Sequence, residues 1–270
     1  MPILALEAEN LIKAYRGGGR AAVDGISFAV APGMVFGLLG PNGSGKTTTV
    51  RILVTLLKPT AGIARVCGFD VARQPERVRQ VIGYAGQSTG IDDDLTAAEN
   101  AAFHGILHGL PHGEAWRRAD EVLAASGLGD AAGIRASRLS GGMRRRLDLS
   151  LALVKRPEVL FLDEPTTGLD PQSRAALWAQ LRRYRDDGMA ILLTTQYLEE
   201  ADRVCDLVAI IDAGKVVAEG PPHALKADLG PQASLDDVFL KHTGSRPRSD
   251  PPARRASSGI FAAAHSRRPR

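Results

Sequence analysis

The residues best suited to chemistry form one glycine-rich run near the start of the chain. In order they are Gly40, Pro41, Asn42, Gly43, Ser44, Gly45, Lys46 and Thr47. The run matches the spacing G-x-x-x-x-G-K-[ST], in which backbone N–H groups surround phosphate oxygens, the lysine reaches the β- and γ-phosphates and the hydroxyl ligates Mg²⁺. The run therefore predicts a site for the phosphates of a nucleotide.

The segments on either side of this run suit such a site. Residues 34–39 are mostly apolar and predict a buried strand that leads into the loop, and residues 46–57 predict a helix. The N-terminal end of that helix would face the phosphates with the positive end of its dipole. Thr48, on its first turn, is included among the residues expected to bind nucleotide.

An acidic pair follows a second apolar run. Residues 159–162 read Val-Leu-Phe-Leu and predict a central parallel strand, and Asp163 and Glu164 come directly after it. Carboxylates there would lie where open α/β sheets bind ligands. Asp163 could hold Mg²⁺ through water, and Glu164 could accept a proton from a water that attacks the γ-phosphate. The alternative is that the two carboxylates are simply solvated at the edge of the sheet and have no role in chemistry.

Composition and charge narrow the class of protein. The chain has 270 residues, 44% of them apolar, enough for a large core in one big domain or two small ones. Its net charge of +4 is concentrated in residues 244–270, where seven Arg and one Asp give +6 and leave −2 for the rest. The folded part is therefore not basic, and we expect no nucleic-acid partner.

The same sequence gives expectations about compartment. No run approaches the roughly 18 apolar residues of a membrane span, and the first ten residues lack the basic start of a signal peptide. We therefore expect a cytoplasmic protein without a signal peptide or transmembrane span. Cys67 and Cys205 have no metal-like spacing and are expected to be ordinary reduced thiols.

Strand and helix patterns alternate along most of the chain and predict an α/β fold with a doubly wound or mixed sheet. Residues 88–156 are nearly all helical in pattern and look like an insertion, opened by a capping box from Thr96 to Glu99. Residues 3–15 predict a strand region with a break, residues 81–87 predict another strand, and residues 234–241 predict one small helix. The Arg-, Pro- and Ser-rich residues 244–270 predict a disordered tail. That tail is either a solvated extension or a basic anchor at an anionic membrane surface.

Three motifs together resemble the nucleotide-binding subunits of ABC transporters. They are the run from Gly40 to Thr47, the tetrapeptide Leu139-Ser140-Gly141-Gly142 and the hexapeptide Leu160-Phe161-Leu162-Asp163-Glu164-Pro165. The resemblance covers about residues 3–220. It implies a P-loop NTPase (RecA-like) mixed-sheet core with an N-terminal antiparallel β subdomain and an inserted all-helical subdomain. The domains would be an ATPase domain at 1–220 with the insertion at about 88–156, a helical extension at 221–243 and the tail at 244–270.

The resemblance also implies the cofactors and partners. ATP and Mg²⁺ would be bound and ATP hydrolysed. Two ATPs would be sandwiched between two copies of the chain in a head-to-tail dimer. An integral-membrane permease subunit would hold the protein peripherally at the cytoplasmic face of the cell membrane.

Residue roles follow by the same resemblance. For nucleotide binding it implies Tyr15 stacked on adenine, Ser44 and Lys46 on phosphates, Ser140, Gly141 and Gly142 closing on the γ-phosphate of the other subunit, and Asp170 in a loop that crosses the dimer interface. For Mg²⁺ it implies Thr47, Gln87 and Asp163, with Gln87 also reporting the nucleotide state to the membrane partner. For catalysis it implies Glu164 as the general base, together with Lys46 and Gln196. From the sequence alone, Tyr15 could equally be a half-buried strand tyrosine.

Two positions depart from the family pattern. Met143 stands where glutamine is usual, and Gln196 stands where most members have a histidine that can donate a charged hydrogen bond to the γ-phosphate. With Tyr197, these departures resemble the daunorubicin-resistance type of bacterial ABC-2 exporters, which implies export of a hydrophobic drug or secondary metabolite. The alternatives are a soluble ABC ATPase that acts as a mechanical switch on ribosomes or DNA, and a nucleotide-binding module that signals without turnover.

Overall fold

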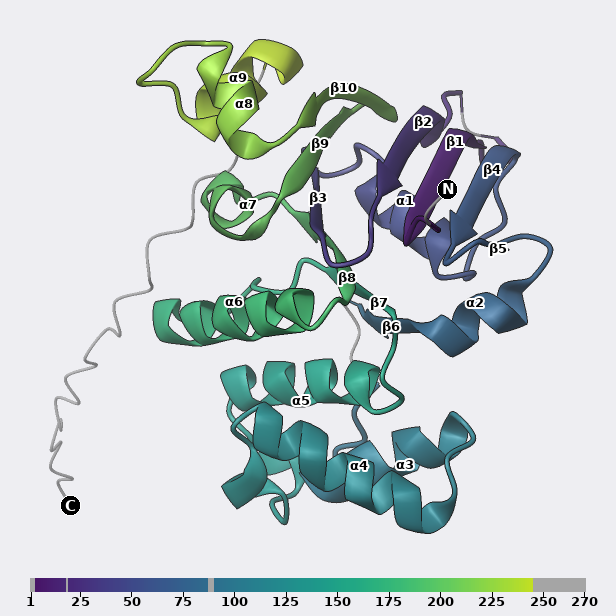
Figure 1. The fold of residues 1–270 in the computed structure, drawn as a ribbon, viewed down its shortest axis with the longest axis vertical. Coiled ribbons are helices and arrows are strands. Elements are labelled where there is room, and N and C mark those ends of the chain that lie inside the picture. Colours follow the sequence, from purple (N-terminus) through teal and green to yellow (C-terminus); the bar gives the residue numbers. More distant parts are fainter. Residues whose placement is uncertain (1–2, 18, 87–89, 245–270) are drawn as a thin grey trace, which may run out of the picture.

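The structure is a computed structural model that describes residues 3–17, 19–86 and 90–244. Figure 1 shows a central sheet, a smaller sheet beside it and a helical region at the lower end of the molecule. The described part therefore has the predicted α/β architecture, with a mixed central sheet and an antiparallel sheet at the N-terminus.

The central sheet sets the position of every candidate site residue. Its strands are β3 (Val35–Leu39), β6 (Ile82–Ala85), β7 (Val159–Asp163), β8 (Ala190–Thr195), β9 (Leu207–Asp212) and β10 (Lys215–Gly220). They lie in the order β10-β9-β3-β8-β7-β6, and all neighbours are parallel except β9 and β10. Because β3, β8 and β7 are parallel neighbours, the residues that follow them meet at one edge of the sheet.

Both faces of this sheet are covered, which explains the uninterrupted apolar runs of its strands. Every residue of β3, β7 and β8 is buried. Along β7 the side chains alternate between two cores: Leu160 and Leu162 pack with α5, α6 and α7, whereas Phe161 packs with α1 and the smaller sheet. The strand ends are therefore fixed from both sides.

The smaller sheet is antiparallel and has the order β2-β1-β4-β5. Its strands are β1 (Leu6–Lys13), β2 (Val23–Val30), β4 (Ala61–Val66) and β5 (Phe69–Asp70). The register of β1 shifts after Ala8, where Asn10 has a φ of 47°. The backbone N–H of Asn10 donates to Ser27 Oγ at 2.8 Å instead of to a strand partner. The predicted break in this strand is thus a β-bulge.

The helices that flank the central sheet are α1 (Lys46–Leu53), α2 (Pro75–Val81), α6 (Pro171–Asp186), α7 (Leu198–Val204), α8 (Pro222–Ala227) and α9 (Leu235–Thr243). The region between β6 and β7 holds α3 (Ala97–Leu107), α4 (His112–Ala125), η1 (Gly129–Ala131), η2 (Ala136–Arg138) and α5 (Gly141–Leu153). The predicted capping box is present: Glu99 N–H donates to Thr96 Oγ1 at 3.2 Å, and Thr96 N–H donates to Glu99 Oε2 at 2.7 Å.

Several predicted boundaries are wrong. The first helix ends at Leu53 rather than at residue 57, because Thr55 has a φ of 66° and breaks the helical ladder. The strand expected at 81–87 is only Ile82–Ala85, since α2 continues to Val81. Pro222 opens a short helix, α8, in addition to the small helix predicted at 234–241, which is α9. Disorder is predicted for residues 244–270. Gly244 is the C-cap of α9, and residues 245–270 lie outside the described residues.

Over the described ranges, every helix is too short or too polar to cross a lipid bilayer.

The capping box gives a test of how the helical region is anchored. We expect Thr96→Ala to lower the free energy of unfolding by about 1 kcal/mol. Glu99 N–H loses its acceptor, and the Glu99 carboxylate loses the hydroxyl that holds it against the N–H of residue 96. Urea denaturation measures the change. Ser137→Ala, which removes an exposed hydroxyl from η2 that caps no helix, is the control. Equal stability of the two variants would contradict the assignment.

Candidate active site

The loop at residues 40–47 is shaped by its glycines. A Cβ at Gly40 would lie 2.2 Å from Ile211 O, and one at Gly45, whose φ is 111°, would lie 2.4 Å from Ala22 O. Only glycine allows so close an approach of the loop to its neighbours. Gly43, at φ 81°, faces open space, with nothing within 4 Å of its added Cβ. The loop is thus tightly seated on one side and open to a ligand on the other.

Lys46 brings a buried positive charge to this loop. Its side chain is 4% exposed, and its Nζ donates to Gly40 O at 2.7 Å and to Pro41 O at 3.1 Å. Burial lowers the pKa of Lys46, and the charges of Glu164 and Asp163 oppose that shift. An ammonium group has three donors, so a third is available to an anion. The lysine is held ready for phosphate by two backbone carbonyls.

Asp163 lies 1% exposed at the end of β7. Its Oδ1 accepts from Thr47 Oγ1 at 3.3 Å and from Thr194 Oγ1 at 2.5 Å. Its Oδ2 is buried without a hydrogen-bond partner among the described residues, and so is Ser44 Oγ in the neighbouring loop. Unpaired buried oxygens are rare. These two therefore mark a place where a polar ligand or cation fits.

Glu164 has an unusual backbone conformation. Its φ of 50° lies in the left-handed region, which non-glycine residues rarely adopt. Its N–H donates to Thr194 Oγ1 at 3.0 Å and to Thr194 O at 3.1 Å, and its Oε2 accepts from Thr167 Oγ1 at 3.4 Å. A cavity of about 510 Å³ adjoins it, with Gly141 at its wall. The carboxylate therefore meets space that a substrate or water can enter.

Gln196 follows β8 and is half-buried at the same edge of the sheet. The turn that carries it is fastened by its neighbours. Thr195 Oγ1 accepts from Tyr197 N–H at 3.0 Å and donates to Glu200 Oε2 at 2.6 Å. Glu200 is 2% exposed, also accepts from Trp178 Nε1 at 3.1 Å, and has a pKa raised by burial. Residue 196 is thus held on a rigid turn.

Ser140, Gly142 and Asp170 lie together at the starts of two neighbouring helices. Ser140 is exposed and caps α5, with its Oγ accepting from Met143 N–H at 3.3 Å. Asp170 caps α6 through Ser173 N–H at 3.0 Å and also accepts from Ser173 Oγ at 2.6 Å. A Cβ at Gly142 would lie 2.8 Å from Ser173 Oγ, so the two helix starts are in close contact.

Tyr15 stands apart from this group. Tyr15 follows the end of β1 and is 47% exposed, with Lys13 Nζ 5.5 Å from the centre of its ring. Its ring face is therefore accessible, but among the described residues it is in contact with a cation rather than with another ring. Gln87 lies outside the described residues.

Sequence reasoning missed three residues that organise the site. Thr194 bonds both Asp163 and the backbone of Glu164, and Glu200 holds the Gln196 turn. Arg145 on α5 donates to backbone carbonyls at the ends of β6 and β7. The two threonines that end the apolar run of β8 were a usable signal for Thr194. The position of Glu200 among the buried residues of α7 was the corresponding signal for that carboxylate.

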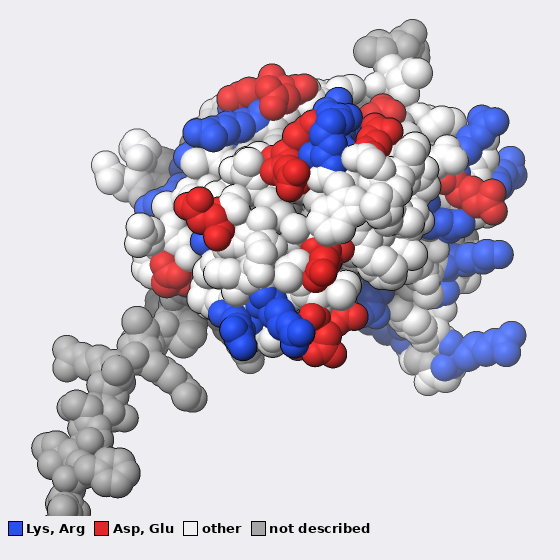
Figure 2. Space-filling model, turned by 90° about the horizontal axis from the view of Figure 1, so that it is seen from below, with Lys and Arg blue, Asp and Glu red and all other residues white. Residues whose placement is uncertain are grey.

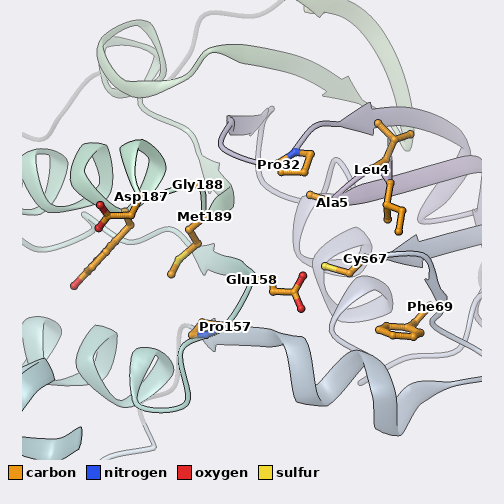
Figure 3. Close-up of a pocket in the computed structure, with 12 residues that line it drawn as sticks. Leu4, Ala5, Pro32, Cys67, Phe69, Pro157, Glu158, Asp187, Gly188 and Met189 are labelled. Atoms are coloured by element: carbon orange, nitrogen blue, oxygen red, sulfur yellow. The ribbon is translucent and has the colours of Figure 1, made fainter. Parts of the chain in front are cut away.

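A second cavity lies elsewhere and holds none of the predicted residues. Its volume is about 600 Å³, and its walls include Pro32, Pro157, Glu158 and Met189. Figure 3 shows Glu158 between Cys67 and Met189 in this cavity. These residues precede β3, β7 and β8, so the cavity is at the opposite ends of the strands from the candidate site.

Comparisons with known proteins agree with this geometry. A family model described as "ABC transporter" matches residues 23–167. The chain is 49% identical over 229 residues to the daunorubicin/doxorubicin resistance ATP-binding protein DrrA of Streptomyces peucetius, covering 85% of this chain and 69% of that one. It is 45% identical over 227 residues to the Nod factor export ATP-binding protein I of Paraburkholderia xenovorans, covering 84% and 74%.

The fold is also similar to that of a solved structure, described as the ATP-binding subunit of an ABC transporter. The TM-score is 0.78 at 28% identity, covering 88% of this chain and 98% of that chain.

The pH dependence of folding tests the buried ion pair beside the site. Asp148 is 5% exposed, and burial raises its pKa to about 6, against the effect of Arg145, whose Nη1 donates to it at 2.7 Å. Because the pKa of Asp148 is higher in the folded state, the folded protein binds the proton more tightly than the unfolded chain. The stability that this proton contributes is fully present below pH 3.8 and is lost as pH rises through 6. We expect the unfolding free energy of the wild type minus that of Asp148→Asn to fall by about 3 kcal/mol over that range. A difference independent of pH, measured by denaturant titration, would contradict this assignment.

Proposed function

The chain belongs to the ABC transporter family, and from that premise we propose that it is the ATP-hydrolysing subunit of an exporter whose membrane-spanning part is a separate permease. The observation that carries the proposal is the meeting of Lys46, Asp163 and Glu164 at one edge of the central sheet. A buried cation there can take the β- and γ-phosphates while a carboxylate next to them receives a proton.

Glu164 is the proposed general base. It follows the buried Asp163 directly, and its carboxylate adjoins the cavity at the site. A positioned carboxylate that takes a proton from the attacking water contributes about 10² to 10⁴ in rate. Lys46 and the loop N–H groups would hold the phosphates, with Ser44, whose buried hydroxyl has no partner among the described residues, as a further contact.

Mg²⁺ is the proposed metal. The donor set fits a hard cation, which prefers oxygen ligands: the Thr47 hydroxyl and the Asp163 carboxylate are in contact, and Asp163 Oδ2 has no hydrogen-bond partner among the described residues. The ion would supply charge compensation for the triphosphate. Gln87, the third expected ligand, lies outside the described residues.

The second copy of the chain is the proposed source of the remaining contacts. Ser140 is exposed at the start of α5, and the Gly141–Gly142 backbone follows it, so this helix start can accept an anion from outside the chain. In a head-to-tail dimer Ser140 and Gly142 would close on the γ-phosphate bound by the other copy, with Asp170 at the interface. Tyr15 would stack on adenine with its exposed ring face.

A groove between the core and the helical region suits the permease. A cavity of about 870 Å³ is lined by residues of both, and the apolar side chains of Leu56 and Leu107 at its wall are 65% and 63% exposed. Arg79 and Lys155 add positive charge. Figure 2, seen from the end where the helical region lies, shows a surface that is largely uncharged, with basic side chains gathered toward its right edge. An ABC-2 permease segment with an apolar face and acidic residues would fit, and would hold the protein at the cytoplasmic face of the membrane.

The transported class is proposed by analogy. The relatives named above are a daunorubicin/doxorubicin resistance protein and a Nod factor export protein. A hydrophobic drug or secondary metabolite is therefore the proposed substrate. A mechanical switch on ribosomes or DNA is the weaker alternative, since the matched relatives named above are proteins of resistance and export.

Glu164→Gln tests the proposed base. We expect kcat for ATP to fall by about 10² to 10⁴, with ATP still bound, because the amide cannot accept the proton. Steady-state phosphate release and equilibrium binding of ATP are the measurements. Glu158→Gln changes the same chemistry at the opposite end of β7 and is expected to stay within about twofold of wild type. Unchanged turnover in Glu164→Gln would refute the assignment.

Gln196→Ala tests the contact to the γ-phosphate. A hydrogen bond from the amide to the charged phosphate is worth about 1.5 to 3 kcal/mol, so we expect kcat to fall about ten- to a hundredfold. Gln196→His is expected to retain activity, because histidine can make the same contact with a charge. If Gln196→Ala keeps full ATPase activity while Lys46→Ala abolishes it, the contact at residue 196 is not needed.

A further inference from the structure

Arg145 connects the helical region to the strand ends of the site. Its Nε donates to Pro165 O at 2.9 Å, its Nη1 donates to Gly86 O at 3.0 Å, and its Nη2 donates to Asp163 O at 3.4 Å. The side chain is only 15% exposed. One guanidinium on α5 thus bonds the backbone beyond β6 and at the end of β7.

Two of these carbonyls lie directly before and after Glu164. Asp163 O belongs to the peptide group that precedes Glu164, and Pro165 O to the residue that follows it. From the other side, Thr194 accepts the Glu164 N–H. A residue with φ of 50° persists only where its surroundings fix it. Arg145 and Thr194 are the groups that fix Glu164.

Asp148 holds Arg145 in place and extends the network. It accepts from Arg145 Nη1 at 2.7 Å and from the backbone N–H of Gly90. Gly86 and Gly90 flank residues 87–89, which lie outside the described residues. Arg145 and Asp148, on one turn of α5, bond to Gly86 and Gly90 respectively. The planar, fixed fork of the guanidinium can satisfy several carbonyls at once, which an ammonium cannot.

We propose that Arg145 is a positioning residue for Glu164, so that the placing of the proposed base depends on the position of α5. The inference rests on the proposed function. Because α5 begins at Gly141, directly after Ser140, any displacement of that helix start moves the carbonyls around Glu164. When the second copy closes on Ser140, the start of α5 would move, and this movement would shift Glu164 of the same chain. The contact at Ser140 would thus act on the base of its own chain as well as on the nucleotide bound by the other copy.

The experiment compares Arg145→Gln and Arg145→Lys with Arg146→Gln in the full chain. Arg146 is the matched control, because it lies on the same helix but donates to Ser126 O and Gly127 O within the helical region. We expect Arg145→Gln to lower kcat about ten- to hundredfold, since small misplacement of a catalytic group costs this much. We expect the ATP affinity of Arg145→Gln to stay within about threefold of wild type. The kcat of Arg145→Lys should lie between those of wild type and Arg145→Gln, and the kcat of Arg146→Gln should equal that of wild type.

A double variant decides whether Arg145 acts through Glu164. If it does, Arg145→Gln combined with Glu164→Gln hydrolyses ATP no more slowly than Glu164→Gln alone, because residues that act as a unit are not additive. The proposal would be overturned if the loss in the double variant equalled the product of the two single losses. It would also be overturned if kcat were unchanged in Arg145→Gln, or if that variant lost as much ATP affinity as kcat. Should Arg145→Gln not fold, the same criteria apply to Arg145→Lys. Unchanged turnover in Glu164→Gln would instead overturn the proposed function.

Discussion

The structure depends on opposite charges held, partly desolvated, at the ends of three neighbouring parallel strands. Lys46 follows β3, Asp163 ends β7 and Thr194, near the end of β8, bonds to Asp163. Burial of an ammonium group is costly unless acceptors face it. Two loop carbonyls and the nearby carboxylates supply that compensation. The two covered faces of the sheet keep these groups together, so the charges can act on a triphosphate without rearrangement of the core.

Much of this arrangement could be predicted because short motifs carry it. The run from Gly40 to Thr47 and the pair after β7 specify backbone shape and charge locally, and the capping residues specify helix starts. Arg145 and Thr194 were missed because their roles depend on distant parts of the sequence. Arg145 contacts residues 18 to 59 positions away, and Thr194 contacts Asp163, 31 positions away. Helix ends were also missed where a single residue, such as Thr55, adopts a left-handed conformation.

One chain alone leaves the start of α5 and one side of the phosphate loop facing outward. The start of α5 presents two glycines and an exposed Ser140, whose Oγ accepts the N–H of Met143 and so caps the helix. The phosphate loop opens on its Gly43 side, where an added Cβ would meet no described atom within 4 Å. A composite site between two copies would bring these surfaces together, and Arg145 would link each helix start to the base of its own chain.

Complementation between two inactive variants tests this composite site most directly. Lys46→Ala and Ser140→Arg chains are each inactive as homodimers in this account, but a mixed dimer keeps one site with Lys46 from one copy and Ser140 from the other. For a two-fold dimer mixed in equal amounts, about a quarter of the wild-type sites are restored. ATPase activity that rises toward this level on mixing is the predicted result. Activity that stays at the level of the separate variants, although the mixed dimer forms, would contradict the account.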